Sequence, residues 1–179
     1  MFVAVILAAK SGGDATQYFD GAPSESLIEC VAAAVLRGPF GGVLVAAHPQ
    51  IAARVREKLH GFAVQFVETA QARNADEVRA AGLKAAADFR ARWEKARAAA
   101  AGRFAGAGGQ DWSKHKQHAD VKVRGLARSF DRDGVLLVPG DALNLSKEKL
   151  AELIEKFTQQ SADESLIDTE IEGLELLKV

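Results

Sequence analysis

Short apolar runs alternate with amphipathic stretches along the chain. The apolar runs predict strands over 2–9, 43–47, 63–67 and 134–138, because they are too short for helices and rich in Val, Leu and Phe. Between them, the spacing predicts helices that end at Leu36, at Leu59 and at Phe157, the first capped by Ser24 or Ser26. Strands that alternate with helices indicate βαβ units. We therefore expect a single α/β domain over 1–179, a three-layer α/β/α sandwich with a mainly parallel sheet.

The region between the third and fourth strands is less regular. An Ala-rich and Arg-rich pattern predicts a helix from Asn74 through Ala101, long enough to be broken or to project from the domain. Four glycines then fall within the eight residues from Gly102 to Gly109, which favours a mobile loop or an ordered flap up to about His118. We treat about 85–130 as a basic helical insertion. A last apolar pattern runs from 166 to 179.

The fourth strand ends on a carboxylate. Val and Leu fill 135–138, and Pro139-Gly140 then closes the run before Asp141. Ligands of open α/β sheets bind at the carboxyl ends of the strands, where an Asp is placed to hold Mg²⁺ against nucleotide phosphates. Alternatively, Asp141 shapes the turn or caps the next helix. Ser146 stands directly before that helix and is the better cap, so we favour the functional role.

A glycine-containing loop follows the first strand. Its sequence, Lys10-Ser11-Gly12-Gly13, lets backbone N–H groups approach an anion, although it matches neither a Walker A motif nor a dinucleotide fingerprint. Glycine also serves ordinary strand-to-helix turns. We interpret the loop as phosphate-binding because it is expected at the same sheet edge as Asp141.

Charge is segregated along the chain although the net charge is only −1. From Lys84 to Arg132 there are twelve Lys and Arg against five Asp and Glu, and from Asp133 to Val179 there are four against eleven. Two solvated faces would explain this pattern, as would a basic segment that meets phosphates or a protein partner. The segment holds few aromatic residues, which does not favour nucleic-acid binding.

The remaining residues with reactive side chains indicate little chemistry. Cys30 is the single cysteine and lies in an apolar run, which predicts a buried thiol and no intramolecular disulfide. His115 and His118 have helical metal spacing, but lysines flank them, and we expect them to be solvated. His48 precedes Pro49 at the end of the second strand, which favours a turn or helix-start role over contact with a base or ribose. No apolar run approaches membrane-spanning length and the first residues lack a basic leader, so we expect a cytoplasmic protein without a membrane partner.

Four segments, in order, resemble one family. They are the strand 5–9 with its glycine loop and helix start, the helix start 74–83, the strand and turn 133–145, and the closing element 166–177. Together they are similar to the MobA-like NTP transferases, nucleotidyltransferases of molybdenum-cofactor type within the sugar-nucleotide pyrophosphorylase fold. The resemblance implies a Rossmann-like nucleotidyltransferase fold. It also implies transfer of a nucleotidyl group from a nucleoside triphosphate with Mg²⁺ to a phosphorylated small-molecule acceptor such as molybdopterin.

The resemblance, together with the position of Asp141 and the glycine loop at the predicted sheet edge, gives a set of candidate site residues. Asp141 and Lys10 would be catalytic, with Asp141 holding the metal and Asp168 as a second ligand if its segment folds back. Nucleotide contacts would come from the glycine loop and from the ends of the strands: Leu7, Ala8, Ala9, Lys10, Ser11, Gly12, Gly13, Asn74 and Gly140.

This chain departs from the family pattern in the segment after the first strand, where the family binds the triphosphate. Lys10 replaces a Gly, and no Arg or Lys stands between Ser11 and Leu36. Arg and Lys bind triphosphates through charge-assisted hydrogen bonds that backbone N–H groups replace poorly. Whether the protein is an enzyme is therefore left open. The alternative is a catalytically degenerate member of the fold that acts as a partner-binding or regulatory module.

Overall fold

The computed structural model describes residues 1–22, 25–106, 134–142, 145–159, 166–167, 171 and 173–178. Its main sheet has six strands, of which the four on one side are parallel and the fifth is antiparallel to its neighbour β6. The predicted α/β class with a mainly parallel sheet is confirmed. In spatial order the strands are β5 (Gln65–Phe66), β4 (Gly42–Ala47), β1 (Phe2–Ala8), β6 (Gly134–Pro139), β8 (Glu175–Lys178) and β7 (Leu166–Ile167).

The centre of the sheet is β1, which pairs in parallel with β4 on one side and with β6 on the other. Ile6 lies opposite Val45 in one pairing and opposite Val138 in the other. Strands in this position are covered on both faces, so nearly every position must be apolar. That requirement explains why β1, β4 and β6 are continuous apolar runs in the sequence.

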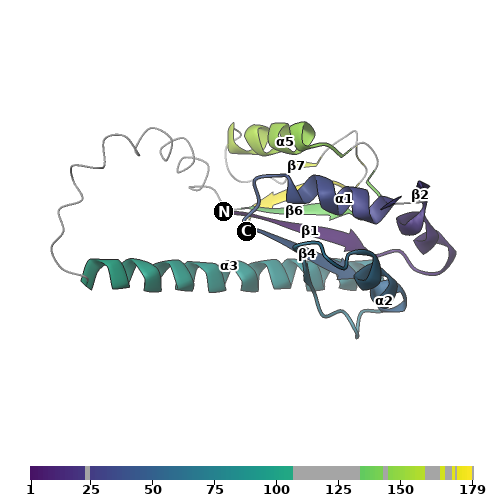
Figure 1. Ribbon diagram of the computed structural model, residues 1–179, viewed down its shortest axis with the longest axis horizontal. Coiled ribbons are helices and arrows are strands. Elements are labelled where there is room, and N and C mark those ends of the chain that lie inside the picture. Colours follow the sequence, from purple (N-terminus) through teal and green to yellow (C-terminus); the bar gives the residue numbers. More distant parts are fainter. Residues whose placement is uncertain are drawn as a thin grey trace.

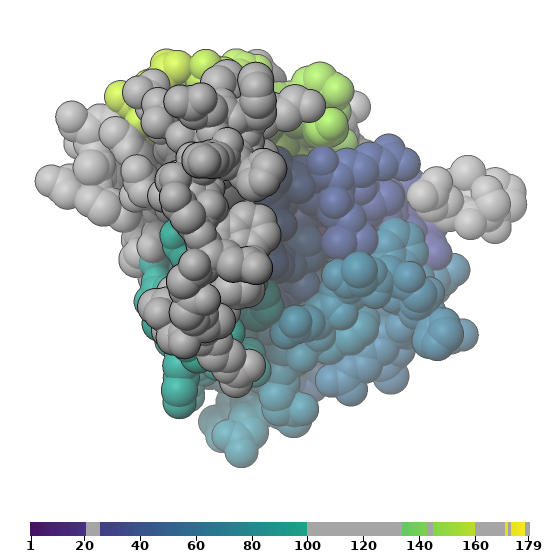
Figure 2. Space-filling model, turned by 60° about the vertical axis from the view of Figure 1, so that its left-hand side comes forward, coloured from purple at the N-terminus to yellow at the C-terminus, as the bar shows by residue number. Residues whose placement is uncertain are grey.

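Helices cover both faces of the sheet and complete three layers. Three helices, α1 (Leu27–Leu36), α2 (Pro49–Lys58) and α5 (Lys147–Gln159), pack on one face, where Ile28, Val55 and Leu150 join the core. Figure 2 shows this face, with α1 between α5 and α2. On the opposite face lies α3 (Ala75–Gly106), which contributes Val78 and Ala86 to a second core cluster. The three-layer arrangement is visible in Figure 1.

Polar side chains start the helices where the sequence predicts. Ser26 begins α1, and its N–H donates to the Glu29 carboxylate over 2.7 Å. Two hydrogen bonds from Ser26, through its hydroxyl and its backbone N–H, lower the pKa of Glu29. Ser146 caps α5 by accepting a hydrogen bond from the Lys149 N–H over 3.1 Å. The cap assigned to Ser146 leaves Asp141 free of that role.

The long helix α3 leaves the body of the domain. Its residues 91–99 are exposed, and the helix projects beyond the sheet as expected (Figure 1). It continues to Gly106, past the predicted end at Ala101, because one Gly lowers helix stability by only about 1 kcal/mol relative to Ala. The rest of the glycine-rich stretch and of the basic insertion, 107–133, lies outside the described residues.

One local expectation is wrong. Cys30 is exposed rather than buried, because the residues of α1 that face the sheet are Ile28, Val31, Ala32 and Val35, and position 30 lies on the other side of the helix. Both glycines of the loop belong to a 3₁₀ helix, η1 (Gly12–Phe19), which is followed by a small hairpin of β2 (Gly21–Ala22) and β3 (Glu25–Ser26). None of the described helices combines the length and apolar character needed to cross a membrane.

Candidate functional site

The carboxyl ends of β1 and β6 form a natural crevice. After β1 the chain continues through α1 to β4, which lies on one side of β1. The strand β6 lies on the other side of β1 and continues into α5. Where crossovers leave neighbouring parallel strands in opposite directions, the loops separate and leave room for a ligand. The two ends are joined by a hydrogen bond from the Gly140 N–H to the Leu7 carbonyl over 2.8 Å. The predicted site residues Ala8 and Gly140 therefore belong to this edge.

An ion pair between Lys10 and Asp141 bridges the crevice. The residues are 131 positions apart, and the Lys10 ammonium donates to the Asp141 carboxylate and, over 2.9 Å, to the Gln17 amide oxygen. The side chain of Lys10 is 45% exposed and that of Asp141 is 15% exposed. The structure thus brings together the two residues that the sequence predicts as catalytic.

Tyr18 holds the backbone at Lys10 in place. Its phenol oxygen accepts a hydrogen bond from the Lys10 N–H over 2.9 Å, and the side chain is almost fully buried. Burial raises the pKa of Tyr18 to about 12; the negative charge of Asp141 adds to this effect, and the hydrogen bond from Lys10 opposes it. A Cβ at Gly140 would lie 3.2 Å from the Tyr18 ring, so the glycine allows close packing here. Sequence reasoning missed Tyr18, which stands out only as the single tyrosine of the chain.

A cavity of about 690 Å³ opens at this edge. Small-molecule sites commonly have volumes of this order, about 300–1,000 Å³. It draws its walls from β1, η1, α3, β6 and the segment around β8. The described lining residues are Leu7, Ala9, Lys10, Tyr18, Ala75, Arg79, Leu137, Pro139, Asp141, Ala142, Ile171, Gly173 and Glu175.

A second ion pair lines the same cavity. Arg79, in the second turn of α3, donates to the carboxylate of Glu175 over 2.6 Å. Glu175 is the first residue of β8, which runs antiparallel to β6. In this pairing Glu175 lies opposite Leu137, near the carboxyl end of β6. Gly173, with φ of +78°, makes the turn that brings β8 to this position. No sequence signal joins two residues that are 96 positions apart, and neither was predicted as a site residue.

In both pairs the cation is the more exposed partner. Arg79 is 42% exposed against 20% for Glu175, as Lys10 is more exposed than Asp141. Ion pairs in contact with water contribute only about 0–1 kcal/mol. An anionic ligand can therefore displace either carboxylate from its cation at small cost. The described charges of the cavity sum to zero, so the cavity can receive a ligand of either sign once a pair separates.

Of the predicted glycine loop, Lys10 lines the cavity, whereas Ser11, Gly12 and Gly13 are not among the described lining residues. Ser11 precedes η1, and Gly12 has φ of +63°, a conformation that favours glycine. A Cβ at Gly12 or Gly13 would meet no atom within 4 Å, so these glycines are not required by packing. Their phosphate-binding role stays a prediction.

Two further predicted residues are placed differently. Asn74 caps α3, because its side-chain oxygen accepts the Glu77 N–H over 2.9 Å. It adjoins Ala75, which lines the cavity, but is not itself among the lining residues. Its contact with nucleotide stays a prediction. Asp168, the proposed second metal ligand, lies outside the described residues.

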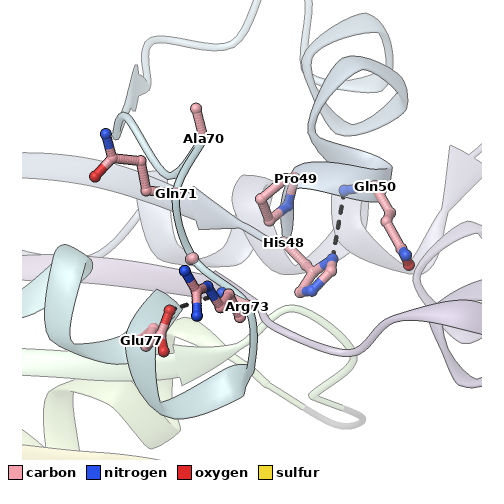
Figure 3. Close-up of a pocket in the computed structure, with 8 residues that line it drawn as sticks. His48, Pro49, Gln50, Ala70, Gln71, Arg73 and Glu77 are labelled. Atoms are coloured by element: carbon pink, nitrogen blue, oxygen red, sulfur yellow. Dashed lines mark hydrogen bonds between the residues drawn. The ribbon is translucent and has the colours of Figure 1, made fainter.

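A neighbouring cavity of about 740 Å³ lies at the carboxyl end of β4 (Figure 3). The start of α2 forms one wall, and the loop before α3, which contains Arg73, forms the other together with Glu77 in the first turn of α3. His48 caps α2, since its Nδ1 accepts the Gln50 N–H over 3.3 Å (Figure 3). This confirms the helix-start role predicted for His48, and the acceptor role leaves the proton of a neutral ring on Nε2.

The donor set fits a metal that arrives with its ligand. Among the described residues, no group of three or more His, Cys, Asp or Glu side chains gathers around one point. Mg²⁺ is often held by one or two carboxylates together with substrate phosphates, rather than by an all-protein cage. Asp141 supplies one such carboxylate at a strand end. The residues present therefore suit Mg²⁺ bound together with phosphates.

Comparison with known proteins supports the fold alone. No family model and no curated protein matches the chain. Among solved structures, it is similar to the crystal structure of the Mycobacterium tuberculosis Rv0371c homologue from Mycobacterium sp. strain JC1. The sequences are 16% identical, the TM-score is 0.55, and the match covers 99% of this chain and 69% of that one. At such low identity the likeness is one of α/β architecture.

Proposed function

We propose that this protein is a MobA-like nucleotidyltransferase that binds a nucleoside triphosphate with Mg²⁺ in the cavity at the ends of β1 and β6. The observation that carries the proposal is the meeting of Lys10 and Asp141 at the crevice between these strands. The order β5-β4-β1-β6 and helices on both faces support the finer assignment to a Rossmann-like nucleotidyltransferase fold. The nucleotidyl group would pass to a phosphorylated acceptor, such as molybdopterin, as the sequence resemblance implies.

Each residue of the site has a role that its position favours. Asp141 would hold Mg²⁺, which when bound supplies charge neutralisation at the phosphates. Lys10, released from Asp141, would bind a phosphate oxygen and stabilise the departing pyrophosphate. Tyr18 holds the Lys10 backbone in place through the 2.9 Å hydrogen bond. Because the chemistry needs in-line attack by the acceptor phosphate, most of the rate would come from positioning.

A second function is favoured by the charge balance of the cavity. Lys10 is neutralised by Asp141 and Arg79 by Glu175, and the segment from Ser11 to Leu36 brings no further Lys or Arg. A triphosphate therefore meets fewer available cations than nucleotidyl transfer normally uses. The alternative is a catalytically degenerate member of the fold that binds a protein partner, with the basic insertion as the contact surface.

Calorimetric titration with each nucleoside triphosphate, with and without Mg²⁺, tests the proposal. The Asp141→Asn variant should lose Mg²⁺-dependent binding and keep its melting temperature, because the residue lies at a strand end and its ion pair is partly exposed. Asp88→Asn is the matched control, since Asp88 is an exposed carboxylate on α3 that does not line the cavity. Equal Mg²⁺-dependent binding by Asp141→Asn and wild type would overturn the assignment.

Release of pyrophosphate separates the two functions. An active enzyme should release pyrophosphate when triphosphate, Mg²⁺ and molybdopterin are supplied together. Nucleotide binding without any pyrophosphate release under these conditions would favour the degenerate module.

A further inference from the structure

Arg79 is the cavity cation for which the proposed function gives no role. It belongs to α3, on the face of the sheet opposite α1, whereas Lys10 follows β1. Both line the same cavity, each held by a carboxylate from the C-terminal part of the chain. The cavity thus presents two separate cations, each with one anionic partner that a ligand can replace.

We propose that Arg79 is a second anion-binding residue of the cavity and that Glu175 restrains it until a phosphate-bearing ligand arrives. The inference rests on the proposed function in taking this cavity as the place where phosphates bind. Arg79 is not among the site residues that the sequence resemblance implies. Its contribution to the affinity for an anion does not depend on a bound metal.

The geometry of the pair favours exchange over permanent structure. The Arg79 side chain is 42% exposed and lines the cavity, and Glu175 accepts a hydrogen bond from its Nη2. A guanidinium presents five donors in a planar fork that suits phosphate oxygens. A phosphate group can therefore join or replace the carboxylate of Glu175 at Arg79.

The backbone around the pair is fixed more firmly than the pair itself. Gly82, one turn after Arg79, lies against the sheet so closely that a Cβ there would be 2.8 Å from the Val5 side chain. Glu175 is held in the ladder between β6 and β7. Arg79 is thus presented to the cavity from a rigid support, which limits the entropy lost when a ligand binds.

Inorganic tripolyphosphate is the probe, because it carries linked phosphates and no base. Calorimetry of the full chain in a chelator should show binding that Arg79→Met weakens by about tenfold, the effect of losing one charge-assisted contact. Glu175→Gln should strengthen metal-free binding by about threefold or more, because the guanidinium loses its charged competitor. Orthophosphate should bind more weakly than tripolyphosphate, since it carries less negative charge and fewer oxygens that can accept hydrogen bonds from the cations.

The double variant Arg79→Met/Glu175→Gln provides the decisive comparison. If Glu175 acts through Arg79, the gain from Glu175→Gln should disappear in the Arg79→Met background. A gain that persists there would overturn the restraining role of Glu175. Unchanged affinity in Arg79→Met, in a variant whose melting curve matches wild type, would overturn the anion-binding role of Arg79.

These outcomes differ from those that test the proposed function. Loss of the proposed function would appear as Mg²⁺-dependent nucleotide binding that ignores Asp141→Asn. The tripolyphosphate titrations contain no metal and do not vary Asp141, so their result stands separately.

Discussion

Tyr18 and Lys10 are joined by a hydrogen bond in which the Lys10 backbone N–H donates to the phenol oxygen over 2.9 Å. This contact connects the buried core under α1 with the rim of the cavity, because Tyr18 belongs to that core and Lys10 pairs with Asp141. The phenol is also near enough to Asp141 for the carboxylate charge to raise its pKa. The single tyrosine of the chain therefore reports on the charge of the site.

The first prediction concerns the titration of Tyr18. Burial raises its pKa to about 12, so the absorbance of phenolate should emerge about two pH units later in the folded protein than in denaturant. Asp141→Asn should lower the midpoint, because the negative charge that disfavours phenolate is removed. A midpoint unchanged by Asp141→Asn would contradict the electrostatic contact, whereas Asp88→Asn should leave the titration as in wild type.

The second prediction concerns stability at high pH. Between pH 10 and about 12 the unfolded chain releases the Tyr18 proton while the folded chain keeps it, so this residue makes stability fall as pH rises. The full contribution is about 2–3 kcal/mol, since one pKa unit corresponds to about 1.4 kcal/mol. Tyr18→Phe should remove this part of the pH dependence, measured as the difference between variant and wild type in urea unfolding.

The same variant, Tyr18→Phe, should also be less stable than wild type at neutral pH. Without the phenol oxygen, the Lys10 N–H loses its acceptor, which destabilises the protein by about 1–3 kcal/mol. If Tyr18→Phe is as stable as wild type at pH 7, the hydrogen bond to Lys10 contributes little to holding the rim.

The central fold follows from burial, and that is why the sequence predicts it. Because β1, β4 and β6 are covered on both faces, their apolar runs are continuous and recognisable. By contrast, β8 is short, begins with Glu175 and pairs antiparallel to β6, so its apolar pattern alone does not define a strand. Tertiary pairing determines its place.

The site is predictable only where a residue directly follows a strand. Lys10 and Asp141 come just after β1 and β6, so the rule for parallel sheets brings both to one edge. Arg79 lies in a helix whose exposed face carries many charged residues, and nothing local distinguishes it from them. Its partner Glu175 reaches the cavity through the reversal of chain direction at Gly173, which a sequence pattern does not reveal.

The third prediction concerns the support of Arg79. A Cβ at position 82 would lie 2.8 Å from Val5 Cγ1, so Gly82→Val should overpack the contact between α3 and β1. Overpacking of a core costs about 1–3 kcal/mol. Ala87→Val is the control for introducing a β-branched side chain, because residue 87 is exposed on the same helix. Val is less favourable than Ala in a helix but more favourable than Gly, so helix propensity cannot explain a loss of stability in Gly82→Val. Chemical denaturation should show a clearly larger decrease in the free energy of unfolding for Gly82→Val than for Ala87→Val. Equal decreases would mean that α3 can move away from the sheet freely.

The last prediction concerns how the affinity of the cavity depends on the number of phosphate groups in the ligand. The segment from Ser11 to Leu36 holds no Lys or Arg, and the described cavity offers two cations, Lys10 and Arg79. A diphosphate already carries two phosphate groups, so the corresponding triphosphate should gain little, within about threefold in affinity, because no further cation awaits the added charge.

Competition calorimetry with the diphosphate and triphosphate of one nucleoside, in the presence of Mg²⁺, measures this ratio. A triphosphate preference above about tenfold would contradict the prediction, because it requires another charge-assisted contact. Lys10→Met then locates that contact. If the preference disappears in the variant, Lys10 provides it alone; if it persists, the contact comes from Arg79 or from a cation of the segment between Lys84 and Arg132. In either case the contact would come from a cation outside the segment from Ser11 to Leu36.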